Sequence, residues 1–304
     1  MLRAIKILIV TALALVLLGA VTGGAGIYFT KNWLETNQPQ MFQPPIFDTE
    51  QPTTDSLPPE NPGQLRVLVF SKTNGFRHHE AIAAAGDMFQ AIARERNWIV
   101  YETENGAIFD TAFERHFDVL VWSNATGDLL TPSQRSGVET FLHSGGGFVG
   151  LHAAGDASHA PWRWYTEEVI RAEFTGHILM PRYQTATLTM EGDHPAIAHL
   201  PVNWQHEDEW YCFDASPRPR TKVLATIDEN ELNLWAIDRR GGARIGSLAM
   251  GDDHPVIWHH EIGNGRIFYS SLGHTPETFQ NNGIKQMLAT AVEWSAANRK
   301  NEQP

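Results

Sequence analysis

One histidine follows a stretch whose residue types predict a strand and then a sharp turn. The stretch runs from Gly145 to Ala154 and reads GGGFVGLHAA. The three glycines can end a preceding helix. The apolar run before His152 is typical of a strand covered on both faces, and the small residues after it permit a tight turn. Open α/β sheets bind ligands at this edge, and hydrolases expose a nucleophile in the same geometry. The pattern predicts a presented imidazole, although a buried histidine beside a packing turn fits it too.

Other histidines lie in loops or directly after predicted strands, where scaffolds present functional groups. His78 follows the first strand in NGFRHH, and His274 follows the last one in SLGHT, which repeats the setting of His152. His177 and His259 are the further candidates. A polar loop with a helix-capping role is the alternative reading of His78, and His274 is weighed in the same way.

Carboxylates stand beside aromatic side chains in the sequence HEDEWY, residues 206–211. Carboxylates accept hydrogen bonds from sugar hydroxyls, and aromatic rings pack on the apolar faces of sugars. A neighbouring imidazole can exchange protons near neutral pH. Asp208, Glu209, Trp210 and Tyr211 are therefore candidate saccharide-binding residues, and a solvated acidic turn with a buried tryptophan is the alternative.

Signatures for a metal or a nucleophile are weak. Converging histidines and a carboxylate could bind zinc or manganese, but no HExxH-like spacing is present, so no cofactor is predicted and a divalent metal stays open. The single cysteine, Cys212, follows the acidic turn, and no Gly-x-Ser-x-Gly stretch occurs. Arg77, Arg163 and Arg182 are candidates for an anionic ligand group, although surface ion pairing is the commoner use of arginine.

The composition favours a globular domain with a small polar ligand. The chain has 304 residues, of which 42% are hydrophobic, enough for one large or two small domains. A formal charge of −12 and the lack of clustered Lys and Arg argue against nucleic acid as a partner.

The amino-terminal segment predicts a membrane anchor. Ile7–Phe29 carries no charged side chain and follows Arg3 and Lys6. A helix of this length would span roughly 35 Å, enough for a ~30 Å hydrocarbon core, and its basic flank would stay cytoplasmic. The rest would then lie on the periplasmic or extracellular side of an inner or plasma membrane. A cleavable signal peptide is the alternative; the spacing of Gly19 and Gly23 is a candidate dimerisation motif, which leaves a homodimer open.

Seven prolines among polar residues from Asn37 to Gly63 indicate an extended linker. The expected organisation is an anchor or signal peptide at 1–30, a Pro-rich linker at 31–64, a folded domain at 65–298 and a polar tail at 299–304.

Strands alternate with helices in the folded domain. This order implies right-handed βαβ units and a doubly wound, three-layer α/β domain with a mostly parallel sheet. The expected strands are Arg66–Phe70, Trp98–Glu102, Asp118–Ser123, Phe148–Leu151, Gln184–Met190, Val223–Ile227, Leu232–Ile237, Val256–His260 and Arg266–Leu272. The expected helices are His79–Arg96, the segment from Thr131 to the glycine triplet, Pro161–Phe174 and Pro276–Asn298.

Together these residues resemble the ThuA-like, or trehalose-utilisation, family, whose fold is similar to the flavodoxin-like class I glutamine amidotransferase domain. The matching pieces occur in family order across about residues 65–298. They are Phe76–His78, Gly145–Ala154, Thr175–His177, His194–Pro195, Asp208–Tyr211, His254–Trp258, Gly265–Arg266 and Leu272–His274.

The resemblance implies a substrate class more than a reaction. The elbow of the amidotransferases carries a catalytic cysteine, and His152 stands in its place, so the fold is implied but glutamine hydrolysis is not. The family is associated with the use of disaccharides such as trehalose and their 3-keto derivatives. By position, a sugar pocket would be faced by His78, His152, Glu209 and His274, with Asp208, His177 and His259 close behind.

Three functions follow as hypotheses. The first is a lyase or hydrolase of keto-glycosides, in which His152 is the general acid or base and Glu209 orients a hydroxyl. In it His78 and His274 stabilise charge that develops on oxygen. The second is a non-catalytic carbohydrate-binding module, and the third is a metal-dependent hydrolase.

Overall fold

Apolar runs form the centre of a sheet in the computed structural model, which describes residues 30–60, 63–178, 181–233, 235–238 and 244–300. Every residue of β1 (Arg66–Phe70), β3 (Val119–Ser123) and β4 (Gly147–Leu151) is buried. β2 (Ile99–Thr103) pairs with β1 at the edge, and all these pairings are parallel. The four strands confirm the expected βαβ beginning of the domain.

The complete sheet has a parallel half and an antiparallel half. Its strand order is β2-β1-β3-β4-β13-β12-β9-β6-β7. The further strands are β6 (Gln184–Met190), β7 (Asn203–Asp208), β9 (Lys222–Ile227), β12 (Pro255–Ile262) and β13 (Gly265–Ser270). Pairing is parallel as far as β13 and antiparallel beyond it. The expected α/β class is confirmed, and the mostly parallel arrangement is found in the first half of the sheet.

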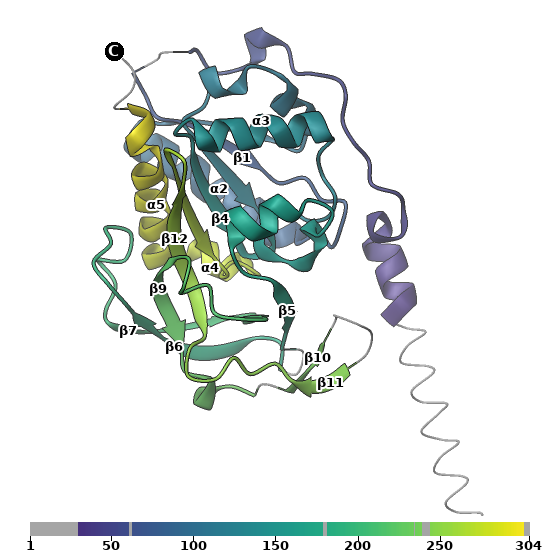
Figure 1. Ribbon diagram of the computed structural model, residues 1–304, viewed down its shortest axis with the longest axis vertical. Coiled ribbons are helices and arrows are strands. Elements are labelled where there is room, and N and C mark those ends of the chain that lie inside the picture. Colours follow the sequence, from purple (N-terminus) through teal and green to yellow (C-terminus); the bar gives the residue numbers. More distant parts are fainter. Residues whose placement is uncertain (1–29, 61–62, 179–180, 234, 239–243, 301–304) are drawn as a thin grey trace, which may run out of the picture. The chain divides into compact units, whose positions relative to one another are not determined.

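Helices cover both faces of the sheet, which makes the three layers (Figure 1). The helices are α2 (His79–Arg96), α3 (Pro132–His143), α4 (Pro276–Gln280) and α5 (Asn282–Lys300). Strand alternation divides the core: Val67 and Val69 pack in the cluster that contains α2 and α5, whereas Leu68 and Phe70 pack with α3. This layering leaves the strand ends free to carry loops.

Two predicted helices differ from the structure. In place of Pro161–Phe174, a π-helix spans Tyr165–Ile170 and ends at Arg171, whose φ of 61° is left-handed. The predicted helix Pro276–Asn298 is broken at Asn281, where the side-chain oxygen caps α5. The Asn281 side chain caps α5 and so divides the second predicted helix, whereas the left-handed backbone of Arg171 ends the first.

Short strands replace predicted turns in the second half. Residues 206–211, for which a solvated acidic turn was the alternative interpretation, continue β7 up to Asp208 and enter β8 (Tyr211–Phe213), which pairs with β5 (Phe174–His177). The strand expected at Leu232–Ile237 begins at Trp235, where β10 (Trp235–Asp238) pairs with β11 (Arg244–Ser247). β5 has four residues and β8 has three, which is too short for alternation to reveal.

The chain divides into two compact units, Met1–Pro44 and Pro45–Pro304. In the first, residues 30–37 are helical and Pro39–Phe42 forms a 3₁₀ turn. The predicted anchor Ile7–Phe29 lies outside the described residues. None of the helices in the described part of the chain has the length and apolarity to cross a bilayer.

The second half of the predicted linker is attached to the domain. The Asp48 carboxylate pairs with Lys72 and accepts a hydrogen bond from the Gly106 N–H at 2.8 Å. The Arg66 guanidinium, ion-paired with Asp118 at 2.7 Å, also donates to the Glu60 carbonyl. Residues 45–60 thus form part of the domain surface.

A buried histidine in β12 gives the fold a pH dependence. His260 donates from Nε2 to the Glu168 carbonyl at 2.9 Å, and burial, followed by the nearby Arg171 guanidinium, lowers its pKa to about 3. In the unfolded chain the pKa of a histidine is ~6.5. As pH falls, His260 is therefore protonated in the unfolded chain before it is protonated in the folded one.

We expect His260 to cost the fold stability as pH falls from about 6.5 toward 3, by at most ~1.4 kcal/mol per pH unit. His260→Gln keeps a donor for the carbonyl and should flatten the pH dependence of the unfolding free energy, measured with urea. Equal slopes for the variant and the wild-type protein between pH 6 and 4 would contradict this assignment.

Candidate functional site

His152 occupies a strained turn at the end of β4. Its φ of 46° lies in the left-handed region, which few residues other than glycine adopt. The Tyr269 hydroxyl donates to the His152 carbonyl at 2.9 Å, and His152 Nδ1 lies 2.7 Å from the Ser271 carbonyl. The predicted strand and sharp turn are confirmed, but the imidazole is fully buried and not presented to solvent. The contacts around the turn hold its strained backbone in place.

A second turn, after β13, carries His274 to the same place. Gly273 has a φ of 125°, and a Cβ there would lie 2.8 Å from the Phe279 ring. Asn124 links the two turns: its amide donates to the Gly273 carbonyl at 3.1 Å, and its oxygen accepts from the Ala153 N–H at 3.4 Å. The carboxyl ends of β3, β4 and β13 therefore fix both imidazoles relative to each other.

Three imidazoles meet at this edge of the sheet. His78, at the amino terminus of α2, has its ring centre 5.0 Å from that of His152 and 4.6 Å from that of His274. The His152 and His274 centres are 5.0 Å apart, and all three interplanar angles are 88–90°. Burial lowers the pKa values of His78 and His274, and their mutual proximity to His152 lowers them further. Both imidazoles are therefore neutral at physiological pH.

The Glu209 carboxylate lies among these rings, and its side chain is 2% exposed. Oε2 is 3.0 Å from His274 Nδ1 and 3.5 Å from His152 Nε2. Oε1 is 3.0 Å from His177 Nδ1 and 3.1 Å from Arg182 Nε. Burial alone would raise the pKa of Glu209, but the surrounding imidazoles outweigh burial and hold that pKa well below its ordinary value. The carboxylate is ionised, and each oxygen serves a different group of partners.

Asp208 supports the site from behind. Its fully buried carboxylate accepts hydrogen bonds from the N–H groups of Gly273 at 2.8 Å and His274 at 3.1 Å, and from the Thr278 hydroxyl at 2.9 Å. Burial opposes ionisation, but the hydrogen bond from His206 and the nearby imidazole of His152 lower the pKa of Asp208 overall. Asp208 thus ties the end of β7 to the His274 turn and to α4.

A cavity of about 40 Å³ opens on this cluster. Its lining consists of Phe76, His78, Asp156, Phe174, His177, Arg182, Glu209, Tyr211 and His274. Tyr183, 41% exposed, has its ring centre 5.4 Å from that of His274. The enclosed space admits a water molecule or one substituent of a ligand, so a larger ligand would lie across the opening beside Tyr183.

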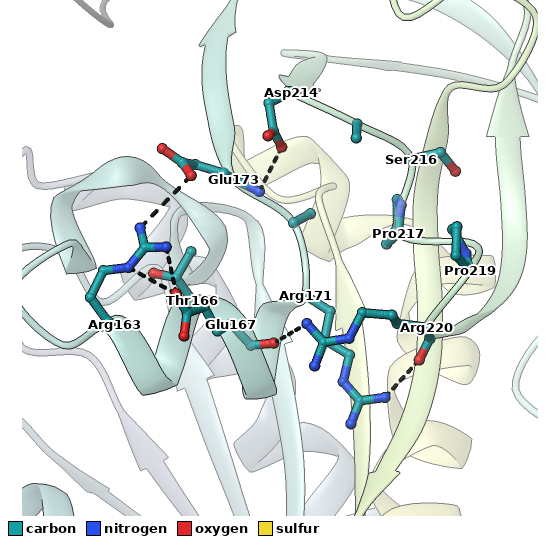
Figure 2. Close-up of a pocket in the computed structure, with 12 residues that line it drawn as sticks. Arg163, Thr166, Glu167, Arg171, Glu173, Asp214, Ser216, Pro217, Pro219 and Arg220 are labelled. Carbon is teal, nitrogen blue, oxygen red and sulfur yellow. Dashed lines mark hydrogen bonds and ion pairs between the residues drawn. The ribbon is translucent and has the colours of Figure 1, made fainter.

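A larger hollow of about 250 Å³ lies beside the π-helix (Figure 2). Its guanidinium groups are already engaged: Arg163 with Glu167 at 2.6 Å, and Arg171 with the Arg220 carbonyl at 2.6 Å. Arg163 therefore has a structural partner here, and among the described residues the lining of this hollow includes no histidine.

Three of the sequence candidates lie away from the cavity. His259 is in the middle of β12, because that strand continues to Ile262, and it packs between His194 and Trp294. Its placement close behind the pocket was wrong.

Trp210 is fully buried in the core, and its ring N–H donates to the Gln184 carbonyl at 2.7 Å. Arg77 is ion-paired with Glu104 at 2.6 Å and does not line the cavity. Both side chains are therefore placed for structural roles, unlike Tyr211, whose ring centre is 4.2 Å from that of His152.

Further lining residues escaped the sequence reasoning. Asp156 follows the elbow by four residues. Phe174, the last residue of the predicted helix Pro161–Phe174, enters the wall as the first residue of β5. Arg182 was considered only as an anion binder, whereas here it meets Glu209. The histidine turns predicted by the sequence do converge: His78, His152, His274 and Glu209 each offer a ligand atom, and these atoms lie within 4.8 Å of one another.

We expect Asp208→Asn to lower the free energy of unfolding by roughly 3 kcal/mol. The substitution replaces one carboxylate oxygen by an NH₂ group, so a donor would face donors that now have an acceptor in Asp208. Urea unfolding measures the loss. Glu207→Gln, an exposed neighbour in the same strand, is the control and should stay within about 0.5 kcal/mol of the wild-type protein. A similar small change for Asp208→Asn would refute the supporting role.

Comparison with known proteins identifies relatives. The sequence model of the family described as ThuA, trehalose utilisation, matches residues 66–295. A ThuA-like protein from Bacteroides uniformis is 21% identical, with a TM-score of 0.64, over 80% of this chain and 94% of its own. Another, from Parabacteroides merdae, is 19% identical, with a TM-score of 0.57, over 77% and 90%. At these identities the two structures show the shared fold. No curated protein matched the sequence.

Proposed function

Because this chain belongs to the trehalose-utilisation (ThuA) family, we propose that its domain is an enzyme acting on a saccharide, either a disaccharide such as trehalose or its 3-keto derivative. The observation that carries the proposal is the Glu209 carboxylate, buried and ionised, with His177 on one oxygen and His152 and His274 on the other. Such a centre can move a proton and stabilise charge on a substrate oxygen without a covalent nucleophile.

The surroundings of the carboxylate suit a sugar. Phe76, Phe174 and Tyr211 line the cavity, and Tyr183 offers an exposed ring at its opening. Aromatic rings of this kind cover the apolar faces of sugars, while the polar groups between them bind hydroxyl or carbonyl oxygens. The small cavity would take the reacting oxygen of the ring, and the second sugar would lie outside.

His177 is the group best arranged for proton transfer. Its Nδ1 lies 3.0 Å from Glu209 Oε1 and 3.1 Å from the Ile178 carbonyl. Both neighbours only accept hydrogen bonds, so Nδ1 carries the hydrogen and Nε2 keeps a lone pair. The Ile178 carbonyl orients the imidazole, and a carboxylate 3.0 Å away stabilises the imidazolium once it forms. We therefore assign the acid-base role to His177 in place of His152, which is fully buried and does not line the cavity.

A 3-keto glycoside gives this arrangement a reaction. The carbonyl at C3 acidifies the C2–H bond, His177 takes that proton, and the electron pair forms an enolate whose charge rests on the carbonyl oxygen. The enolate then re-forms the carbonyl, a C1=C2 double bond appears, and the C1–O bond breaks. The departing glycosidic oxygen takes the proton back from His177, which leaves an enone and a free second sugar.

The cysteine does not take part. Cys212 lies in β8, fully buried, and burial raises its pKa to about 12. A thiol of that kind is neither ionised nor accessible. The elbow position that presents cysteine in the amidotransferase relatives holds His152 instead.

The test combines binding and turnover of 3-keto-trehalose. The saccharide should raise the melting temperature of the wild-type protein, and product should form. His177→Gln should retain the thermal shift and lose roughly 10²- to 10⁴-fold in kcat, whereas Glu207→Gln should match the wild-type protein. Full turnover by His177→Gln would contradict the assignment of His177 as the acid-base group. Thermal shifts without product from any disaccharide would instead indicate a binding module.

We also propose that the uncharged segment Ile7–Phe29 holds the domain at a membrane. Its length and basic flank support an anchor. The full chain should sediment with membranes and require detergent for release, and a chain beginning at residue 30 should stay in the supernatant. Release of the full chain by alkaline carbonate alone would contradict anchoring.

A further inference from the structure

We propose that His78, His152, His274 and Oε2 of Glu209 bind one divalent transition-metal ion, of the class to which zinc and manganese belong. Its catalytic meaning rests on the proposed function, because the ion would lie where charge develops on the substrate oxygen. Its existence does not depend on the saccharide, and the experiments below keep the two apart.

Three of the four donor atoms lie at nearly the spacing of a coordination shell. Ligands bound at about 2.1 Å, with angles between 90° and 109°, lie roughly 3.0–3.4 Å apart. His152 Nε2 and His274 Nδ1 are 3.0 Å apart, and Glu209 Oε2 lies 3.5 Å and 3.0 Å from them. The set that includes His78 falls within 4.8 Å, so a small movement of that ring would complete the shell around an ion.

Lone pairs converge at this point. The Ser271 carbonyl, 2.7 Å from His152 Nδ1, can only accept, so the hydrogen of the neutral ring is on Nδ1 and Nε2 carries a lone pair. Nε2 then faces another acceptor, Glu209 Oε2, at 3.5 Å. If both rings are neutral, only His274 Nδ1 can carry a hydrogen at this point, and it cannot satisfy both His152 Nε2 and Glu209 Oε2. One bound cation would instead be coordinated by His152 Nε2, His274 Nδ1 and Glu209 Oε2.

The positions of the rings are fixed as metal ligands usually are. The backbone carbonyl that holds His152 is the kind of partner that sets the tautomer and ring orientation of a metal-bound histidine. Asp208 accepts the N–H of His274 at 3.1 Å and so fixes the turn that carries it. His78 has a buried Nδ1 with no hydrogen-bond partner among the described residues. A buried ring nitrogen without a partner is costly, and a bound ion at the cluster would explain why this ring is kept there.

The ligand set selects the kind of metal. Imidazole suits zinc, iron, copper and nickel, and carboxylate oxygen also suits manganese, whereas calcium and magnesium prefer oxygen ligands throughout. Arg182 and His177 lie on Oε1, so Oε2 is the oxygen turned toward His152 and His274. The cavity of about 40 Å³ in front of the cluster leaves room for one substrate oxygen on the ion. An ion there would polarise a keto group as a Lewis acid, while His177 remains free to carry the proton.

The direct test is metal binding by the full chain in detergent, without saccharide. After treatment with a chelator and dialysis, calorimetric titration with ZnCl₂ or MnCl₂ should show one equivalent bound, confirmed by elemental analysis, and MgCl₂ should not compete. His78→Ala and His274→Ala should each weaken binding by at least about 100-fold. His79→Ala, which removes the exposed neighbour of His78, is the matched control and should bind as the wild-type protein does.

Circular dichroism of the metal-free variants shows whether they are folded. If His78→Ala or His274→Ala is not folded, Glu209→Gln takes its place in the titration. The proposal is overturned if the wild-type protein binds no stoichiometric metal, or if folded His78→Ala and His274→Ala bind it equally well. A thermal shift by 3-keto-trehalose without metal binding would overturn the metal site and leave the proposed function standing. Metal binding without any response to saccharides would support the metal site and contradict the proposal that the substrate is a saccharide.

Discussion

The site depends on one buried carboxylate that two sets of side chains share. Glu209 is ionised in an environment that would ordinarily favour its neutral form, and the imidazoles around it are the main groups that lower its pKa. Oε2 meets His152 and His274, whereas Oε1 meets His177 and Arg182. The carboxylate therefore separates a side that can stabilise negative charge on oxygen from a side that can move a proton.

The fold brings these groups together because it ends several strands at one edge. β4 and β13 are neighbouring parallel strands, so the turns that carry His152 and His274 are adjacent. Asn124 joins those turns, and Asp208 joins them to the end of β7. The strained backbone at His152 is tolerated because these hydrogen bonds and the packing around them leave the chain no relaxed alternative. A static, preorganised site is the result, which is what charge stabilisation requires.

Sequence reasoning identified the histidine turns well, because each follows an apolar strand and breaks its pattern. The elbow at His152 and the parallel strands beside it were predictable from local residue types. His259 was misplaced because its antiparallel strand continues two residues further than its hydrophobic pattern suggests. Contacts across the site, such as Arg182 on Glu209 or Tyr183 beside His274, arise from loops far apart in the sequence, so spacing alone could not reveal them.

The most direct measurement is the visible absorption spectrum of the cobalt(II)-loaded full chain during titration with 3-keto-trehalose. Cobalt held by three imidazoles and a carboxylate should absorb in the visible range, and binding of the keto oxygen should shift its bands with saturation at one equivalent of sugar. This result would place the metal, the carboxylate and the substrate oxygen at one point. A spectrum that stays unchanged while calorimetry shows the sugar binding would contradict the account, because substrate and metal would then occupy separate sites.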